Sequence, residues 1–148
     1  KAPAFALDGS DGKKHAIKDY LGKRVVIYFY PRDNTPGCTK ESCGFRDLDA
    51  EIKDLNTVVL GVSKDSLKSH DKFIADFNLP FVLLSDPETK MMAKYGAWGE
   101  KVLYGKTSVG CIRSTVIIDE KGKIIKHWRK VPKAEAHPAK VLEILQNL

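Results

Sequence analysis

A short apolar run followed at once by a helical pattern constrains the fold of this chain more than any other stretch. Residues 25–30 are β-branched and aromatic, the composition of a strand that is buried on both faces. The run ends at Pro31, and from Cys38 onward apolar residues recur at spacings of three and four. That spacing predicts a helix with one buried face and charged residues on the other.

Cys38 stands at the start of this predicted helix. The sequence NTPG at residues 34–37 supplies turn and N-cap residue types just before it. Cys38 precedes Phe45 by seven positions, so it should lie on the inward face. Backbone N–H groups and the helix dipole at an N-terminus favour an anion, which should stabilise the thiolate. Most free cysteines are inert buried residues, but this position favours a reactive one.

Composition limits the remaining possibilities. A chain of 148 residues can bury a core without disulfide bonds, and we expect residues 1–148 to form one domain. Three cysteines are too few for a secreted disulfide scaffold, which favours a reducing compartment such as the cytoplasm. No apolar run is long enough to span a membrane, and no signal-peptide pattern is present. A targeting segment removed before Lys1 stays an open alternative.

The charged residues and the histidines predict neither a nucleic-acid partner nor a metal site. The net charge of +6 comes from lysines and arginines spread along the chain, and the densest cluster, residues 126–133, interleaves only one tryptophan. A groove that stacks bases would need more aromatic residues. The histidines are scattered singly without a close cysteine, so we expect ordinary surface histidines: His15, His70, His127 and His137.

The rest of the chain predicts strands that alternate with helices. We expect a hairpin of residues 4–7 and 14–17, where the sheet starts, and further strands at residues 58–62, 81–84, 114–118 and 123–128. Helices are expected from about residue 67 to 79, from 87 to about 96, and from 138 onward. Residues 97–110 are expected to form a glycine-rich loop. This order predicts a three-layer α/β/α fold around a central mixed sheet.

The strongest motif resembles a known family. Pro31, Thr35 and Cys38 form the pattern P-x-x-x-T-x-x-C, which resembles the active-site motif of the peroxiredoxins. Arg113, in the sequence IRSTVIID, looks like the arginine that this family draws from a distant strand. Cys43, five positions after Cys38, is similar to the Q-type subgroup, also called bacterioferritin comigratory protein. The resemblance covers nearly the whole chain and implies a thioredoxin-like fold.

The resemblance also implies an activity. Members of this family reduce hydrogen peroxide and organic hydroperoxides without a cofactor, and thioredoxin or a similar dithiol usually supplies the electrons. Cys38 would attack the peroxide and become a sulfenic acid, which would then form an intramolecular disulfide bond with Cys43.

Other residues of the motif would prepare the peroxide for attack. Arg113, the Thr35 hydroxyl and the backbone N–H groups of Gly37 and Cys38 would be hydrogen-bond donors aimed at the peroxide oxygens. Pro31 would form a rigid wall that shields the thiol from water and bulky oxidants.

Geometry requires a change in the helix before the two cysteines can bond. Five residues along an ideal helix separate the Cα atoms of Cys38 and Cys43 by about 8.6 Å, whereas a disulfide bond needs roughly 7 Å or less. We therefore expect residues 37–47 to be helical in the reduced protein and irregular when the bond is formed. Glycine at positions 37 and 44 should lower the cost of unwinding.

Several alternatives stay open. A disulfide reductase would carry C-x-x-C, which is not the spacing here, but a non-enzymatic redox-sensing or chaperone-like binding protein is not excluded. Cys111 stands where the family pattern predicts an apolar residue, and it is either a buried packing residue or a second thiol near the pocket. The chain ends at Leu148 without the cysteine-bearing tail of the dimeric members, so we expect a monomer.

Overall fold

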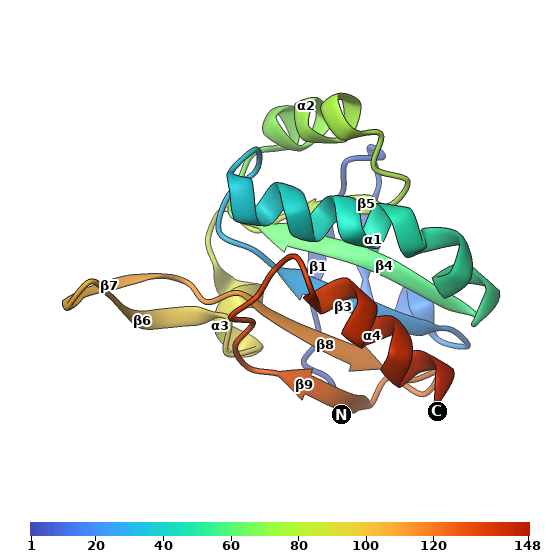
Figure 1. Ribbon diagram of the computed structural model, residues 1–148. Coiled ribbons are helices and arrows are strands. Elements are labelled where there is room, and N and C mark those ends of the chain that lie inside the picture. The colour runs from blue at the N-terminus through green and yellow to red at the C-terminus, as the bar shows by residue number, and fades with distance from the viewer.

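The computed structural model describes residues 1–148 except for the side chain of Leu103. A five-stranded sheet runs through its centre (Figure 1). Its strands lie in the order β5 (Val82–Ser85), β4 (Thr57–Ser63), β3 (Arg24–Phe29), β8 (Ser114–Ile118) and β9 (Ile124–Trp128). β3, β4 and β5 are parallel, whereas β8 is antiparallel to both β3 and β9. The predicted mixed sheet is confirmed.

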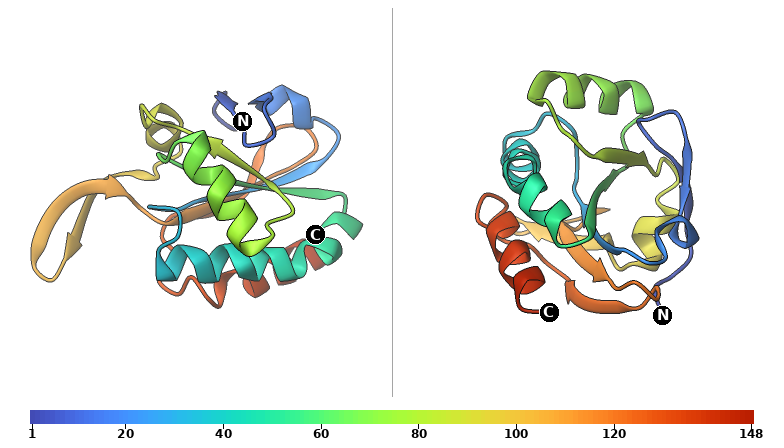
Figure 2. Two further views of the ribbon diagram at one scale, coloured as in Figure 1. Left: turned by 90° about the horizontal axis from the view of Figure 1, so that it is seen from above. Right: turned by 90° about the vertical axis from the view of Figure 1, so that its right-hand side faces the viewer.

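Helices cover both faces of the sheet, which confirms the three-layer α/β/α fold (Figure 2). One face carries α1 (Pro36–Asp54), α2 (Leu67–Phe77) and α4 (His137–Gln146), and the other carries the 3₁₀ helix η1 (Ile17–Tyr20) and α3 (Lys90–Lys94). Alternate side chains of β3 enter the two cores. Tyr28 packs with Cys38 and Phe45 on the first face, while Val25 and Ile27 join the second core.

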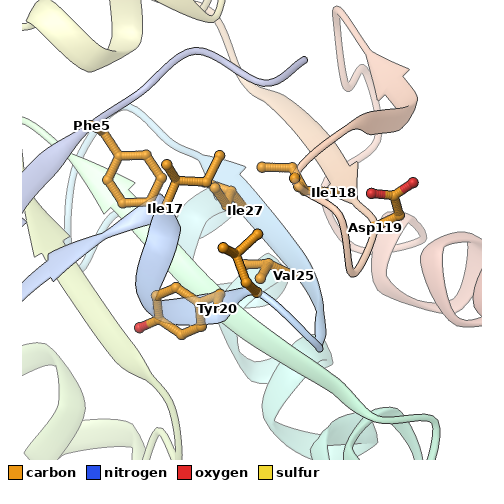
Figure 3. A pocket seen from close by; sticks show the side chains of 9 residues that line it. Phe5, Ile17, Tyr20, Val25, Ile27, Ile118 and Asp119 are labelled. Atoms are coloured by element: carbon orange, nitrogen blue, oxygen red, sulfur yellow. The ribbon is translucent and has the colours of Figure 1, made fainter.

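The second core contains a small apolar cavity, shown in Figure 3. Phe5, Ile17, Val25, Ile27 and Ile118 are among the residues that line it. Its volume of about 10 Å³ is close to the space of a single water molecule. Because it lies on the side of the sheet opposite α1, it has no part in the chemistry of Cys38.

Two elements differ in part from their prediction. The hairpin of β1 (Ala6–Asp8) and β2 (Lys14–Ala16) forms its own two-stranded sheet, so the central sheet does not start there. The helix expected from residue 87 is shorter, because residues 86–89 form a turn before α3 begins at Lys90. Asp86 still serves that helix, since its carboxylate accepts a hydrogen bond from the Met92 backbone N–H at 2.9 Å.

The prediction of a loop at residues 97–110 was wrong. β6 (Trp98–Leu103) and β7 (Lys106–Cys111) pair there as an antiparallel hairpin that projects from the body of the molecule (Figure 1). Tyr104 and Gly105 form its two-residue turn, both with positive φ (52° and 76°), which suits the twist of a tight hairpin. Most side chains of β7 are exposed, so its sequence shows little of the alternation that marks a half-buried strand.

Candidate active site

Cys38 lies where β3 passes into α1, buried between the helix and the sheet. Thr35 is the N-cap of α1, and Pro36 is its first residue. The Cys38 side chain is fully buried and packs with the core on its own side of the sheet, as its spacing from Phe45 predicted. The N–H of Thr39 bonds to the carbonyl of Thr35 at 2.8 Å, so the N–H groups of Gly37 and Cys38 precede the helical ladder and have no acceptor in it.

Arg113 comes to this thiol from the segment between β7 and β8. Its Nη2 lies 3.2 Å from Sγ of Cys38, within hydrogen-bonding distance for sulfur. A Cβ at position 37 would stand 3.2 Å from the same Nη2, so glycine leaves room for the guanidinium beside the helix. The carbonyl of Arg113 accepts the Val131 N–H at 2.8 Å, which anchors the backbone of the arginine.

Glu41 completes this group, although the sequence pattern did not predict it. Its Oε1 accepts a hydrogen bond from Nη1 of Arg113 at 2.7 Å, and the side chain is 0% exposed. Burial raises the pKa of the Glu41 carboxyl to about 7, and the charge and hydrogen bond of Arg113 offset part of that rise. Among the described residues, its other oxygen, Oε2, has no hydrogen-bond partner. Glu41 follows Cys38 by three positions and so lies on the same face of the helix. This spacing could have identified Glu41, but charged residues were expected on the outward face.

The Thr35 hydroxyl does not cap the helix. It donates a hydrogen bond to the carbonyl of Arg32 at 2.8 Å. The expectation that this hydroxyl would donate to a peroxide is therefore wrong, because its hydrogen is used in the bond to Arg32. Its oxygen can still accept a hydrogen bond from another group.

Two open pockets meet at Arg113. One, of about 520 Å³, is lined by Pro31, Cys111, Ile112, Val131 and neighbouring residues. The other, of about 530 Å³, lies beside Gly37 and Lys40. Arg113 lines both pockets, whereas the Cys38 side chain has no exposed surface. Arg113 therefore connects both pockets to the buried thiol.

The other two cysteines lie at different depths. Cys43 is half-buried in the same continuous helix as Cys38, and all three cysteines are free thiols. Cys111 ends β7, is 5% exposed, and belongs to the core on the side of the sheet opposite Cys38. Burial raises the pKa of the Cys111 thiol to about 12, so it stays protonated at neutral pH.

The expectation of four surface histidines was wrong for two of them. His70 and His137 are buried, with side chains bonded to Asp33 and Thr115 respectively. Sequence spacing did not reveal these partners because each lies more than twenty positions away. Within the residues that the structure describes, no three His, Cys, Asp or Glu side chains gather as a metal site would require. No helix in the described chain has the length and apolar character to cross a membrane.

Comparisons with known proteins agree with this arrangement. The model of the AhpC/TSA family matches residues 1–127. Peroxiredoxin Bcp of Bacillus subtilis is 45% identical over 148 residues, covering 100% of this chain and 94% of the relative. The putative peroxiredoxin bcp of Coxiella burnetii is 46% identical over 142 residues, covering 96% of this chain and 93% of the relative.

Solved structures show the same fold. Peroxiredoxin Q of Xanthomonas campestris superposes with a TM-score of 0.90 at 38% identity, over 97% of this chain and 90% of the other. The bacterioferritin comigratory protein of the same organism, described for its alkyl peroxide reduction activity in trapped intermediate and ligand complexes, gives the same values. This chain therefore belongs to the AhpC/TSA family, and within it to the peroxiredoxins of the Bcp or Q type.

Proposed function

We propose that residues 1–148 form a single peroxiredoxin domain that reduces hydrogen peroxide and organic hydroperoxides with Cys38 as the nucleophile. The contact between Arg113 and Cys38 carries this proposal, because it places a permanent cation 3.2 Å from a thiol at a helix N-terminus. The alkyl peroxide reduction activity described for the Xanthomonas campestris relative supports the same reaction class.

The proposed first step transfers one oxygen atom to sulfur. The Cys38 thiolate attacks one peroxide oxygen, an S–O bond forms, and the O–O bond breaks. The second oxygen leaves with the electron pair and takes up a proton, giving water from hydrogen peroxide or an alcohol from an organic hydroperoxide. The sulfur is oxidised to a sulfenic acid as the peroxide is reduced by two electrons.

Ionisation of a thiol alone contributes little to such a reaction. Lowering the pKa of an ordinary thiol from ~8.5 to ~6 raises its thiolate fraction at pH 7 by ~30-fold, but weaker nucleophilicity cancels roughly 13-fold of this gain. Oriented hydrogen-bond donors must supply the rest. We assign this role to Arg113 and the free N–H groups of Gly37 and Cys38, with the Thr35 oxygen accepting a peroxide hydrogen and Pro31 shielding the site.

The proposed second step forms a disulfide bond between Cys38 and Cys43. The Cys43 thiolate attacks the sulfenic sulfur, the S–O bond breaks, and the oxygen leaves as water after protonation. Thioredoxin or a similar dithiol then reduces the bond and is itself oxidised. α1 has to open for this step, and the structure adds a cost to that opening: a Cβ at Gly44 would lie 2.7 Å from Cγ of Pro138, so α4 packs directly on the helix there.

A peroxide-consumption assay with and without a thioredoxin system tests the proposal. Catalytic turnover that depends on the thioredoxin system is the expected result, and stoichiometric oxidation without turnover would favour a non-enzymatic redox sensor or a chaperone-like binding protein. We further propose that the protein is a cytoplasmic monomer, because three cysteines are too few for a secreted disulfide scaffold and one chain supplies Cys38, Cys43 and Arg113 together.

A further inference from the structure

A buried acid and histidine lie beside the turn that leads to Thr35. Nδ1 of His70 is 2.7 Å from Oδ2 of Asp33, and the two side chains are 0% and 1% exposed. Asp33 belongs to the loop between β3 and α1, whereas His70 belongs to α2. Burying such groups costs free energy unless each of their polar atoms is satisfied.

Hydrogen bonds satisfy the Asp33 carboxylate almost completely. Its Oδ1 accepts the Tyr30 hydroxyl at 2.5 Å, and its Oδ2 accepts the Ser69 hydroxyl at 2.9 Å as well as the bond from His70. These donors come from Tyr30, the residue after β3, and from α2. The carboxylate therefore ties the loop before α1 to two separate elements.

The same contacts show that the pair shares a proton. Nε2 of His70 lies 2.9 Å from the carbonyl oxygen of Leu84, which only accepts, so Nε2 must carry a hydrogen. Nδ1 faces a carboxylate oxygen, and a bond between them needs a further proton. Whichever atom holds that proton, Asp33 and His70 together carry no net charge, which reduces the cost of their burial.

The peptide unit between Arg32 and Asp33 connects this pair to the site. Its N–H donates to Oδ2 of Asp65 at 2.8 Å, and its carbonyl accepts the Thr35 hydroxyl at 2.8 Å. Asp65 is fixed in turn by the Ser63 hydroxyl at 2.7 Å. The orientation of one peptide group therefore decides where the Thr35 hydrogen points and where its acceptor lone pairs are free.

We propose that Asp33 and His70 are positioning residues for the reaction of Cys38 with peroxide. They hold the peptide that orients the Thr35 hydroxyl, and they contact neither the thiol nor the peroxide. This inference rests on the proposed peroxidase function. It predicts that breaking the pair slows the peroxide reaction through Thr35 while leaving the reactivity of the thiol toward other electrophiles unchanged.

Two substitutions separate the two hydrogen bonds of the histidine. In His70→Asn, the amide nitrogen can take the place of Nδ1 and still donate to Asp33. In His70→Gln, the amide nitrogen can take the place of Nε2 and donate to Leu84, which leaves Asp33 without that donor. Each variant keeps one of the two bonds, so they form a matched pair.

The measurement is the second-order rate of Cys38 oxidation by hydrogen peroxide, beside the rate of its alkylation by iodoacetamide. For His70→Gln we expect the peroxide rate to fall about 10- to 100-fold with little change in alkylation, and for His70→Asn we expect most of the peroxide rate to remain. Equal losses in both variants, or peroxide and alkylation rates that fall together, would overturn the inference.

A double-mutant cycle with Thr35→Val tests the route of the effect. Without the Thr35 hydroxyl, His70→Gln should slow the peroxide reaction no further, whereas an undiminished effect would overturn the inference. If either His70 variant does not fold, Ser69→Ala is the substitute, because it removes only the hydroxyl that donates to Asp33. Its effect on the peroxide rate must likewise disappear in the Thr35→Val background. A wild-type protein that peroxide does not oxidise at Cys38 would instead refute the proposed function itself.

Discussion

Arg113 holds two partners at once, and its planar guanidinium group makes this geometry possible. Nη1 bonds to Glu41 and Nη2 to Cys38, at 2.7 Å and 3.2 Å. A lysine at this position would supply the positive charge at a single point and could not reproduce both directions. The structure thus explains why the chemistry should depend on arginine and not on a cation alone.

Arg113→Lys should therefore slow peroxide reduction by about 100-fold at neutral pH, the typical cost of removing one oriented donor. The second-order rate with hydrogen peroxide, followed across a range of pH, measures this loss. A slower rate should persist at high pH, where any thiol is ionised. Recovery of the wild-type rate there would show that Arg113 acts only on thiol ionisation.

Glu41 gives the folded protein a titration near neutral pH. Burial raises its pKa from about 4.5 to about 7, so between these values the folded protein keeps a proton that the unfolded chain has lost. This contribution to stability is fully present below about pH 4.5 and is lost as pH rises through 7. The upper limit of the loss is roughly 3 kcal/mol.

Glu41→Gln should abolish this pH dependence, because an amide does not titrate. Free energies of unfolding from urea titrations between pH 4 and 8 are the measurement. Relative to the variant, the wild-type protein should lose stability as pH rises through this window. Parallel curves for the two proteins would mean that Glu41 does not titrate there.

Glu41, Asp33 and His70 could not be assigned from sequence for a common reason. Each is buried by a partner far along the chain: 72 positions separate Glu41 from Arg113, and 37 separate Asp33 from His70. Sequence periodicity predicts which face of an element is apolar, but it does not reveal a polar group on that face that has a distant partner. By contrast, Pro31, Thr35, Gly37 and Cys38 are close in sequence, and their grouping was predictable.

Among the elements, α1 is the one that must change during the proposed cycle. It is continuous over Pro36–Asp54 while Cys38 and Cys43 are free thiols, which agrees with the expectation for the reduced protein. The contact of Gly44 with Pro138 means that opening its first turns also disturbs α4.

Oxidation to the disulfide should expose the amides of residues 37–47. Hydrogen exchange followed by mass spectrometry on the reduced and oxidised forms should show lost protection in this segment, while β3 and β8 stay protected. Equal protection in both forms, or a mapped disulfide bond from Cys38 to Cys111, would contradict the proposed change.

Elements with a regular pattern of buried residues or a clear cap were predicted correctly from the sequence. β8 is buried at every position and was placed correctly at residues 114–118, and α2 begins at the Ser66 cap as its sequence indicated. The β6–β7 hairpin was not predicted because it projects from the body of the molecule, and the mostly exposed residues of β7 show no alternation of apolar and polar side chains. Its turn at Tyr104 and Gly105 was the available local signal.

At the scale of the whole molecule, the fold brings two distant parts of the chain to one thiol. The β3–α1 junction supplies Cys38, and the segment before β8 supplies Arg113, because β3 and β8 are neighbours in the sheet. We expect this single chain to hold the complete site as a monomer. Sedimentation velocity should give one species near 16.5 kDa, and activity that appears only in a dimer would refute this expectation.

The most direct test of the account is peroxide consumption by the wild-type protein, Cys38→Ser and Cys111→Ala, each supplied with a thioredoxin system. Cys38→Ser should lose all turnover, because a hydroxyl group is not ionised at neutral pH and cannot replace the thiolate nucleophile. Cys111→Ala should keep nearly full turnover, because Cys111, although it lines a pocket beside Arg113, is a buried thiol of the opposite core that stays protonated. Turnover that survives in Cys38→Ser would contradict the assignment of Cys38 as the peroxide-reducing residue.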